Sequence, residues 1–166
     1  MIRRAAWFAA VAISMAGIAA AASTWCLGMG GLGPIRAGMK YEEVLRLADW
    51  PGAEGHKQPQ ECWYLRYDAD FQLLMHADTV VRIELRGESK LHTFAGAHVG
   101  TTEAELGALY GTRLDIQPHK YDEHGHTITV RSGSGDYGLR FETSNGKVTA
   151  IQAGPWEHLN YVEGCG

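Results

Sequence analysis

IRAGMKYEEV, residues 35–44, and AHVGTTEAEL, residues 97–106, are two copies of one pattern in this chain of 166 residues. Each copy has a short extended piece, then a glycine, and then acidic residues ahead of an apolar one. The pattern is typical of a strand end that turns at glycine into the first turn of a helix. In the second copy Thr102 and Glu105 have capping-box spacing, so each side chain can satisfy an unpaired amide of that turn. The first copy has Lys40 at the cap position, which predicts a weaker start.

Stretches that alternate or run apolar follow each helix start and predict β-strands. They cover 62–67, 71–76 and 79–85 in the first half, and 113–117, 126–131, 137–143 and 147–153 in the second. Asn145-Gly146 between the last two predicts a tight hairpin. We therefore expect an α+β fold: two tandem repeats of a helix followed by an antiparallel β-meander, with the helices on one side of the sheet. The tail at 159–162 is expected to add an edge strand.

The Ile-x-x-Gly-Met-x-x-x-Glu-Val motif of residues 35–44 resembles the helix start of the small outer-membrane assembly lipoproteins of the SmpA/OmlA type. Its doubling in one exported chain resembles the secreted β-lactamase inhibitory protein, which has two helix-plus-sheet repeats. The resemblance covers residues 35 to about 154 and implies a sheet with helices on one side and the other face exposed to a partner. The chain departs from the lipoproteins because Trp25, which is not a small residue, precedes Cys26. The motif carries over no contact residue.

The first 22 residues have the composition of a secretory signal peptide. Arg3 and Arg4 precede an uncharged apolar run that ends in Ala20-Ala21-Ala22 before Ser23, which is the Ala-x-Ala pattern of signal-peptidase cleavage. An uncleaved membrane anchor is the alternative, because the run is close to the shortest span. We expect cleavage and a periplasmic or secreted protein.

The remaining chain is expected to form one compact unit. Residues 23–34 are a glycine-rich lead-in that we predict to be poorly ordered, 35–90 are the first repeat, and 91–166 are the second repeat with a C-terminal tail. Cleavage would change the net charge from −4 to −6. An acidic chain without a basic stripe is a poor match for nucleic acid or for an anionic membrane surface, so we predict neither nucleic-acid binding nor stable membrane insertion of the mature chain.

Three cysteines allow one disulfide in an oxidising compartment, and the third cysteine then has no partner for a second one. Cys62–Cys165 is the pairing we predict, because Cys26 lies in the glycine-rich lead-in. That disulfide would close a loop of about 100 residues and stabilise the fold by ~4 kcal/mol in the chain-entropy model. A reactive, catalytic cysteine is the other use of the third residue, but the sequence places no activating group beside it.

One dense polar segment, residues 119–126, could carry chemistry. His124 and His126, two apart on a strand, would point to the same side, as the ligands of a single zinc do. Asp122 or His119 could supply a third ligand, which would make a zinc-dependent hydrolase the alternative function. The competing interpretation is an ordinary hairpin turn, since Asp122 to Gly125 are residues that turns prefer. We expect no cofactor.

Aromatic residues on the predicted strands favour recognition of another protein. Trp63 and Tyr67 share a strand face, and Tyr137 begins a later strand. Large aromatics anchor interfaces, and the acids Asp68 and Asp70 would form their rim. The alternative is that these rings pack against one another within the sheet. We predict an exported, non-catalytic protein-binding module of the inhibitor, immunity or envelope-assembly type.

Overall fold

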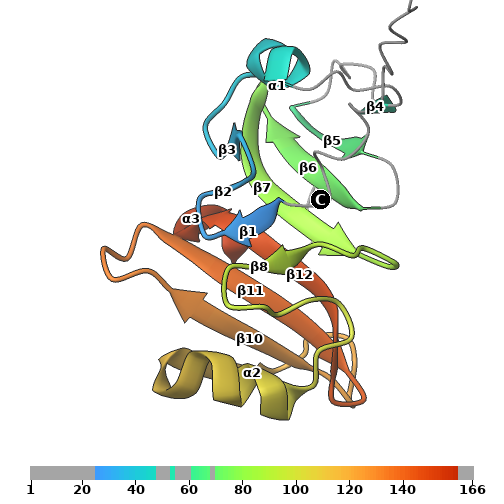
Figure 1. Cartoon of the computed structure of the whole chain (residues 1–166), viewed down its shortest axis with the longest axis vertical. Helices are drawn as coiled ribbons and strands as arrows, with labels where there is room; N and C mark the ends of the chain where they lie inside the picture. Colours follow the sequence, from blue (N-terminus) through green and yellow to red (C-terminus); the bar gives the residue numbers. More distant parts are fainter. Residues whose placement is uncertain (1–24, 48–52, 55–60, 68–69, 161–166) are drawn as a thin grey trace, which may run out of the picture.

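The protein is a mainly β structure built on one large antiparallel sheet (Figure 1). The computed structural model describes residues 25–47, 53–54, 61–67 and 70–160. The large sheet has eight strands in the order β4-β5-β6-β7-β12-β11-β10-β9. Their bounds are β4 Ala53–Glu54, β5 Cys62–Tyr67, β6 Phe71–His76, β7 Thr79–Arg86, β9 Leu114–Pro118, β10 His126–Arg131, β11 Tyr137–Ser144 and β12 Lys147–Pro155.

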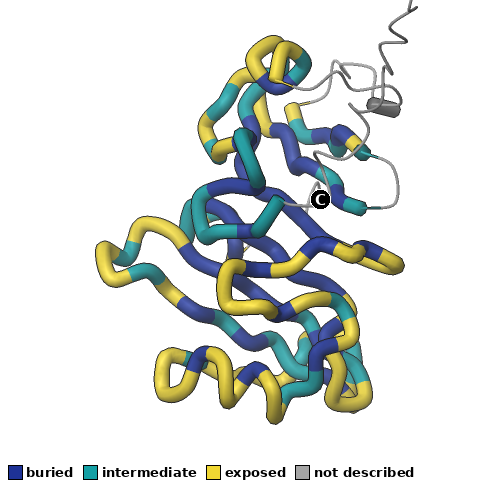
Figure 2. The backbone as a smooth tube through the Cα atoms, viewed as in Figure 1, coloured by how far each residue is buried: buried dark blue, intermediate teal, exposed yellow. Residues whose placement is uncertain are grey.

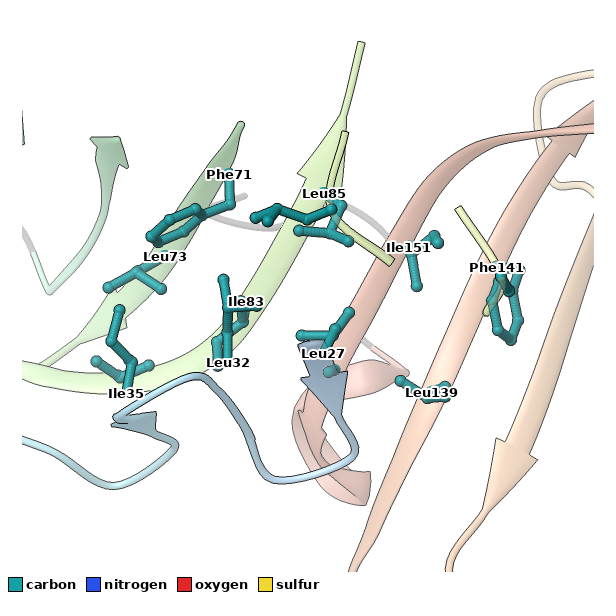
Figure 3. Packing of buried hydrophobic residues seen from close by; sticks show 14 of the residues in the cluster. Leu27, Leu32, Ile35, Phe71, Leu73, Ile83, Leu85, Leu139, Phe141 and Ile151 are labelled. Atoms are coloured by element: carbon teal, nitrogen blue, oxygen red, sulfur yellow. The ribbon is translucent and has the colours of Figure 1, made fainter. Parts of the chain in front are cut away.

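A second, smaller sheet packs on one face of the large one (Figures 1 and 3). Its order is β3-β2-β1-β8, and β1 pairs with β8 in parallel. The strands are β1 Cys26–Gly28, β2 Gly31–Leu32, β3 Ile35–Arg36 and β8 His92–Thr93. Figure 3 shows side chains from this sheet, among them Leu27 and Leu32, facing Ile83 and Leu139 of the large sheet.

The prediction of a poorly ordered lead-in is therefore wrong. Leu27 and Leu32 are almost completely buried, and so is Ile35, which follows the lead-in. Each such side chain contributes about 1.5–3 kcal/mol when it leaves water. That burial fixes the glycine-rich segment in place.

The described residues also form three short α-helices: α1 Tyr41–Leu47, α2 Glu103–Tyr110 and α3 Trp156–Leu159. A 3-10 turn, η2 Gly111–Arg113, follows α2. Among the described residues, no helix has the length and apolar character needed to cross a membrane. The proposed signal segment, residues 1–22, lies outside the described residues.

The predicted fold class, α+β with two tandem helix-plus-meander repeats, is wrong. The helices have seven, eight and four residues, and α1 buries Val44 alone while α2 buries Leu106 and Tyr110. The apolar faces of α1 and α2 are too short to cover a sheet, so the small β-sheet supplies most of the covering layer. The two groups of strands also form one sheet, because β7 pairs directly with β12.

The two aligned sequence segments nevertheless begin their helices with the same contacts. Gly38 and Gly100 have φ values of 92° and 95°, a region that suits glycine because it lacks a Cβ. Their amides donate to the carbonyls of Val80 in β7 and Val148 in β12, at 2.8 Å in both cases. The likeness is local, and it ties each helix start to a strand of the large sheet.

The predicted capping box of α2 is confirmed. The Thr102 hydroxyl accepts from the Glu105 amide at 3.2 Å, and the Glu105 carboxylate accepts from the Thr102 amide at 2.7 Å. The Thr102 amide, followed by its hydroxyl, holds the pKa of Glu105 below its usual value. At α1 the Lys40 amide donates to Glu43 at 2.7 Å, but lysine offers no oxygen for the return bond.

Several strand predictions match closely. The bounds of β5, β6 and β10 are those predicted from alternation. Asn145 and Gly146 have φ values of 49° and 73°, as a type I′ hairpin between β11 and β12 requires. The predicted edge strand at 159–162 is wrong where it can be seen, because Leu159 ends α3 and is buried. Residues 161–166, and with them Cys165, lie outside the described residues.

The central strands of the large sheet contain runs of consecutive buried residues, drawn dark blue in Figure 2, so both faces of the sheet are covered there. On β7, Ile83 and Leu85 face the small sheet. Arg82 and Glu84, which alternate with them along the strand, are buried on the opposite face. Arg82 donates through Nε to Glu84 at 2.7 Å, and Gln72 of β6 donates to the other carboxylate oxygen at 2.7 Å.

The helix α3 lies against this charged face. Arg82 donates to the His158 carbonyl at 3.3 Å, and Arg140 donates to the Leu159 carbonyl at 3.0 Å. The last carbonyls of a helix have no intrahelical donors, and cations are favourable there. Two buried arginines of the sheet therefore hold the C-terminal end of α3.

Candidate binding site

A hollow of about 670 Å³ opens beside the small sheet. Its volume lies within the range of ligand and side-chain pockets. Aromatic side chains and glycine backbone form most of its surface, with one charged side chain. The lining residues are Trp25, Cys26, Gly28, Gly30, Gly31, Gly33, Arg36, Ala37, Phe94 and Tyr137.

The glycines let the walls of the hollow lie close to the backbone. A Cβ at Gly31 would stand 2.8 Å from the Arg36 side chain and 2.4 Å from the Ile35 carbonyl oxygen. A Cβ at Gly33 would stand 2.4 Å from the Trp25 ring, and Gly33 also has a φ of 53°. A Cβ at these two glycines would displace the neighbouring side chain or the strand itself.

Phe94 is the most exposed large apolar side chain among the described residues, at 81%. Its backbone is held in place, because its amide donates to the Leu27 carbonyl at 3.2 Å. The preceding residue, Thr93, is buried and shares a hydrogen bond of 2.8 Å with the Tyr110 hydroxyl. The phenyl ring thus stands in solvent on a rigid support.

Cys26 lies at the edge of the hollow as a thiol. Its sulfur is 3.7 Å from Nδ1 of His92, the residue opposite it in the parallel β1–β8 pair. The same Nδ1 lies 3.0 Å from the Thr93 carbonyl oxygen. A carbonyl only accepts, so this contact favours the tautomer that carries its hydrogen on Nδ1 and directs it toward Thr93. In that tautomer Nδ1 is not the open acceptor that an activated cysteine nucleophile needs beside it.

The structure separates the aromatic residues that the sequence predicts as binding anchors. Trp63 is buried, and its ring meets that of Tyr41 edge-on at 5.3 Å. Tyr67 stacks on Phe71 at 4.9 Å and packs against the core. Trp63 and Tyr67 do share a face of β5, but that face is the core face. Trp63 packs against α1 and Tyr67 against the neighbouring strand, so core packing describes both residues better than recognition does.

Tyr137 is the one predicted anchor that lines the hollow. Of the predicted rim acids, Asp70 is partly exposed, and Asp68 lies outside the described residues. Sequence reasoning missed Trp25 and Phe94. Phe94 sits between the short β8 and Gly96, where no alternation marks a strand, and an aromatic in such a turn is the signal that could have indicated it.

The predicted metal ligands are held in other contacts. Asp122 accepts from the His124 amide at 2.9 Å and from the Gly125 amide at 3.1 Å, through its side chain and carbonyl respectively. These bonds make the hairpin turn of the competing interpretation. The Ser144 side chain, followed by the His124 amide, lowers the pKa of Asp122. His119 Nδ1 accepts from the Asp122 amide at 3.0 Å.

His126 belongs to a different contact, between α2 and the sheet. Its Nδ1 is 2.8 Å from the carboxylate of Glu103, which also accepts from the Thr143 hydroxyl at 2.6 Å. Burial alone would raise the pKa of Glu103, but the bonds from Thr143 and His126 lower it below its usual value. Within the described part of the chain, no three His, Cys, Asp or Glu side chains are grouped to hold a metal ion.

No protein-family model, no curated protein and no solved structure matches this chain.

Proposed function

We propose that this protein is an exported, non-catalytic protein-binding module that works in the periplasm or outside the cell. Its partner would be an enzyme that it inhibits, a toxin that it neutralises or an envelope assembly that it supports. The signal-like segment at residues 1–22 supports export. The likeness of residues 35–44 to the helix start of envelope-assembly lipoproteins supports the same class of function.

The exposed phenyl ring of Phe94 carries this proposal. An exposed aromatic on a fixed backbone loses little conformational entropy when a partner covers it. Full burial of a phenylalanine side chain is worth about 1.5–3 kcal/mol. Phe94 and the exposed Tyr137 stand on the same hollow, and aromatics in such pockets supply most of the energy of many interfaces.

The test is capture of a partner from the envelope of the native host with the exported protein. Phe94→Ala and Tyr137→Ala are compared with Tyr121→Ala, which removes a ring that is 64% exposed in the β9–β10 connection and does not line the hollow. We expect the two hollow variants to lose at least about tenfold in affinity for the captured protein. Unchanged thermal unfolding would show that each variant folds. Equal recovery by all three variants would remove the hollow from the proposal.

A further inference from the structure

The hollow has a chemical asymmetry that restricts what it can bind. Its walls are apolar, and Arg36 is its one charged lining residue. Nη1 of Arg36 donates to the carbonyls of Gly33 and Ile35, at 2.5 and 2.9 Å. These bonds hold the guanidinium at the hollow while it remains exposed.

Arg36 differs from the buried arginines of the sheet. Arg82 and Arg140 each face a glutamate, whereas no ion pair between described residues includes Arg36. Carbonyl bonds orient a guanidinium without neutralising its charge. In a chain of net charge −4, this site is a local positive spot. A guanidinium pairs well with a carboxylate, because its planar fork can make two parallel hydrogen bonds to it.

We propose that the hollow binds an acidic–aromatic peptide segment of the partner protein, with an apolar or aromatic side chain among Trp25, Phe94 and Tyr137 and a carboxylate on Arg36. This inference rests on the proposed protein-binding function and adds the chemistry of the partner. In an extended segment, side chains two residues apart lie on the same side, about 7 Å from each other. One such pair can therefore reach both the apolar walls and the guanidinium.

Three blocked peptides of glycine and serine test the two contacts separately. The first carries Trp and Glu two positions apart, the second replaces Glu by Lys, and the third replaces Trp by Ala. Binding is followed by amide chemical shifts of the ¹⁵N-labelled protein, and we expect shifts at Gly28, Gly31 and Gly33. The Trp–Glu peptide should bind roughly tenfold more tightly than either of the others. No binding, or equal binding of the Lys peptide or the Ala peptide, would overturn the inference.

Variants of the protein give a second, independent measurement. Arg36→Gln should lower the affinity for the Trp–Glu peptide by roughly fivefold and abolish the dependence of that affinity on salt. Arg36→Lys, which keeps the positive charge, should restore the salt dependence. Arg66→Gln, which removes an exposed arginine outside the hollow, is the control and should change neither. If a captured partner depends on Phe94 but not on Arg36 or on salt, the carboxylate is wrong and the protein-binding function stands. If a captured partner depends on neither Phe94 nor Tyr137, the hollow is not its binding surface and this inference fails while the protein-binding function stands. If no partner is captured, the proposed function itself fails.

Discussion

Arg82 and Arg86 contact the same carboxylate, but Arg82 is buried and Arg86 is half exposed. Replacing each by methionine therefore compares the loss of a buried charge with the loss of an exposed one. Arg82 Nε lies 2.7 Å from one oxygen of Glu84, and Arg86 Nε lies 2.9 Å from the other. The side chain of Glu84 is fully buried, that of Arg82 is 1% exposed and that of Arg86 is 49% exposed. Removing one partner of a buried pair costs about 3–5 kcal/mol, because the remaining charge is left uncompensated out of water. The guanidinium of Arg86 is half in water, where an ion pair is worth about 0–1 kcal/mol, and its removal leaves the contact between Arg82 and Glu84 in place.

We therefore expect Arg82→Met to lower the free energy of unfolding by about 3–5 kcal/mol and Arg86→Met by less than about 1 kcal/mol. Equilibrium unfolding in urea, followed by circular dichroism, measures both, and equal slopes would show that the denatured states are comparable. The double variant Arg82→Met/Glu84→Met should be more stable than Arg82→Met alone, since the only charge that it leaves without Glu84 is that of the half-exposed Arg86. Equal losses for the two single variants would refute this account of the charged face.

Three further predictions concern separate features. Burial, which outweighs the attraction of Glu157, lowers the pKa of His158, so the unfolded chain binds more protons than the folded one as the pH falls through this range. The free energy of unfolding should therefore decrease as the pH drops below about 6.5, towards the lower pKa of the folded state. Urea midpoints measured against pH should show this decrease, and His158→Asn should make it smaller. Gly33→Ala should destabilise the fold more than Gly38→Ala by thermal unfolding, because both have positive φ but a Cβ at Gly38 meets nothing within 4 Å. Mass spectrometry of non-reduced peptides should find Cys62 linked to Cys165, and a crosslink to the third cysteine would contradict that pairing.

The strands of the large sheet were predictable because one of their faces is a continuous apolar core. Period-two alternation located β5, β6 and β10 to the residue, and the Asn145-Gly146 dipeptide located a hairpin. Local chemistry also sufficed for the start of α2, where Thr102 and Glu105 satisfy each other's amides. These features depend on near neighbours in the chain, which a sequence displays directly.

The small sheet and the charged face depend on distant residues and were missed. Strands of two or three residues show no periodicity, and Leu27 gains a core only because Ile83 and Leu139 reach it from far along the chain. Arg82 and Glu84 alternate with apolar residues as a solvent-facing set would. They are covered by contacts with other elements, among them α3, which no local pattern in the sequence indicates. The hollow shares the first of these difficulties, since residues of the small sheet line it.

The parallel pairing of β1 with β8 joins residues that are 66 positions apart, and this sets an order of events during folding. Contacts between distant residues form late, because the intervening loop must close first. The small sheet cannot be completed until residue 93 has emerged from the ribosome or the export channel. If the chain is exported unfolded, the aromatic hollow would assemble only on the far side of the membrane.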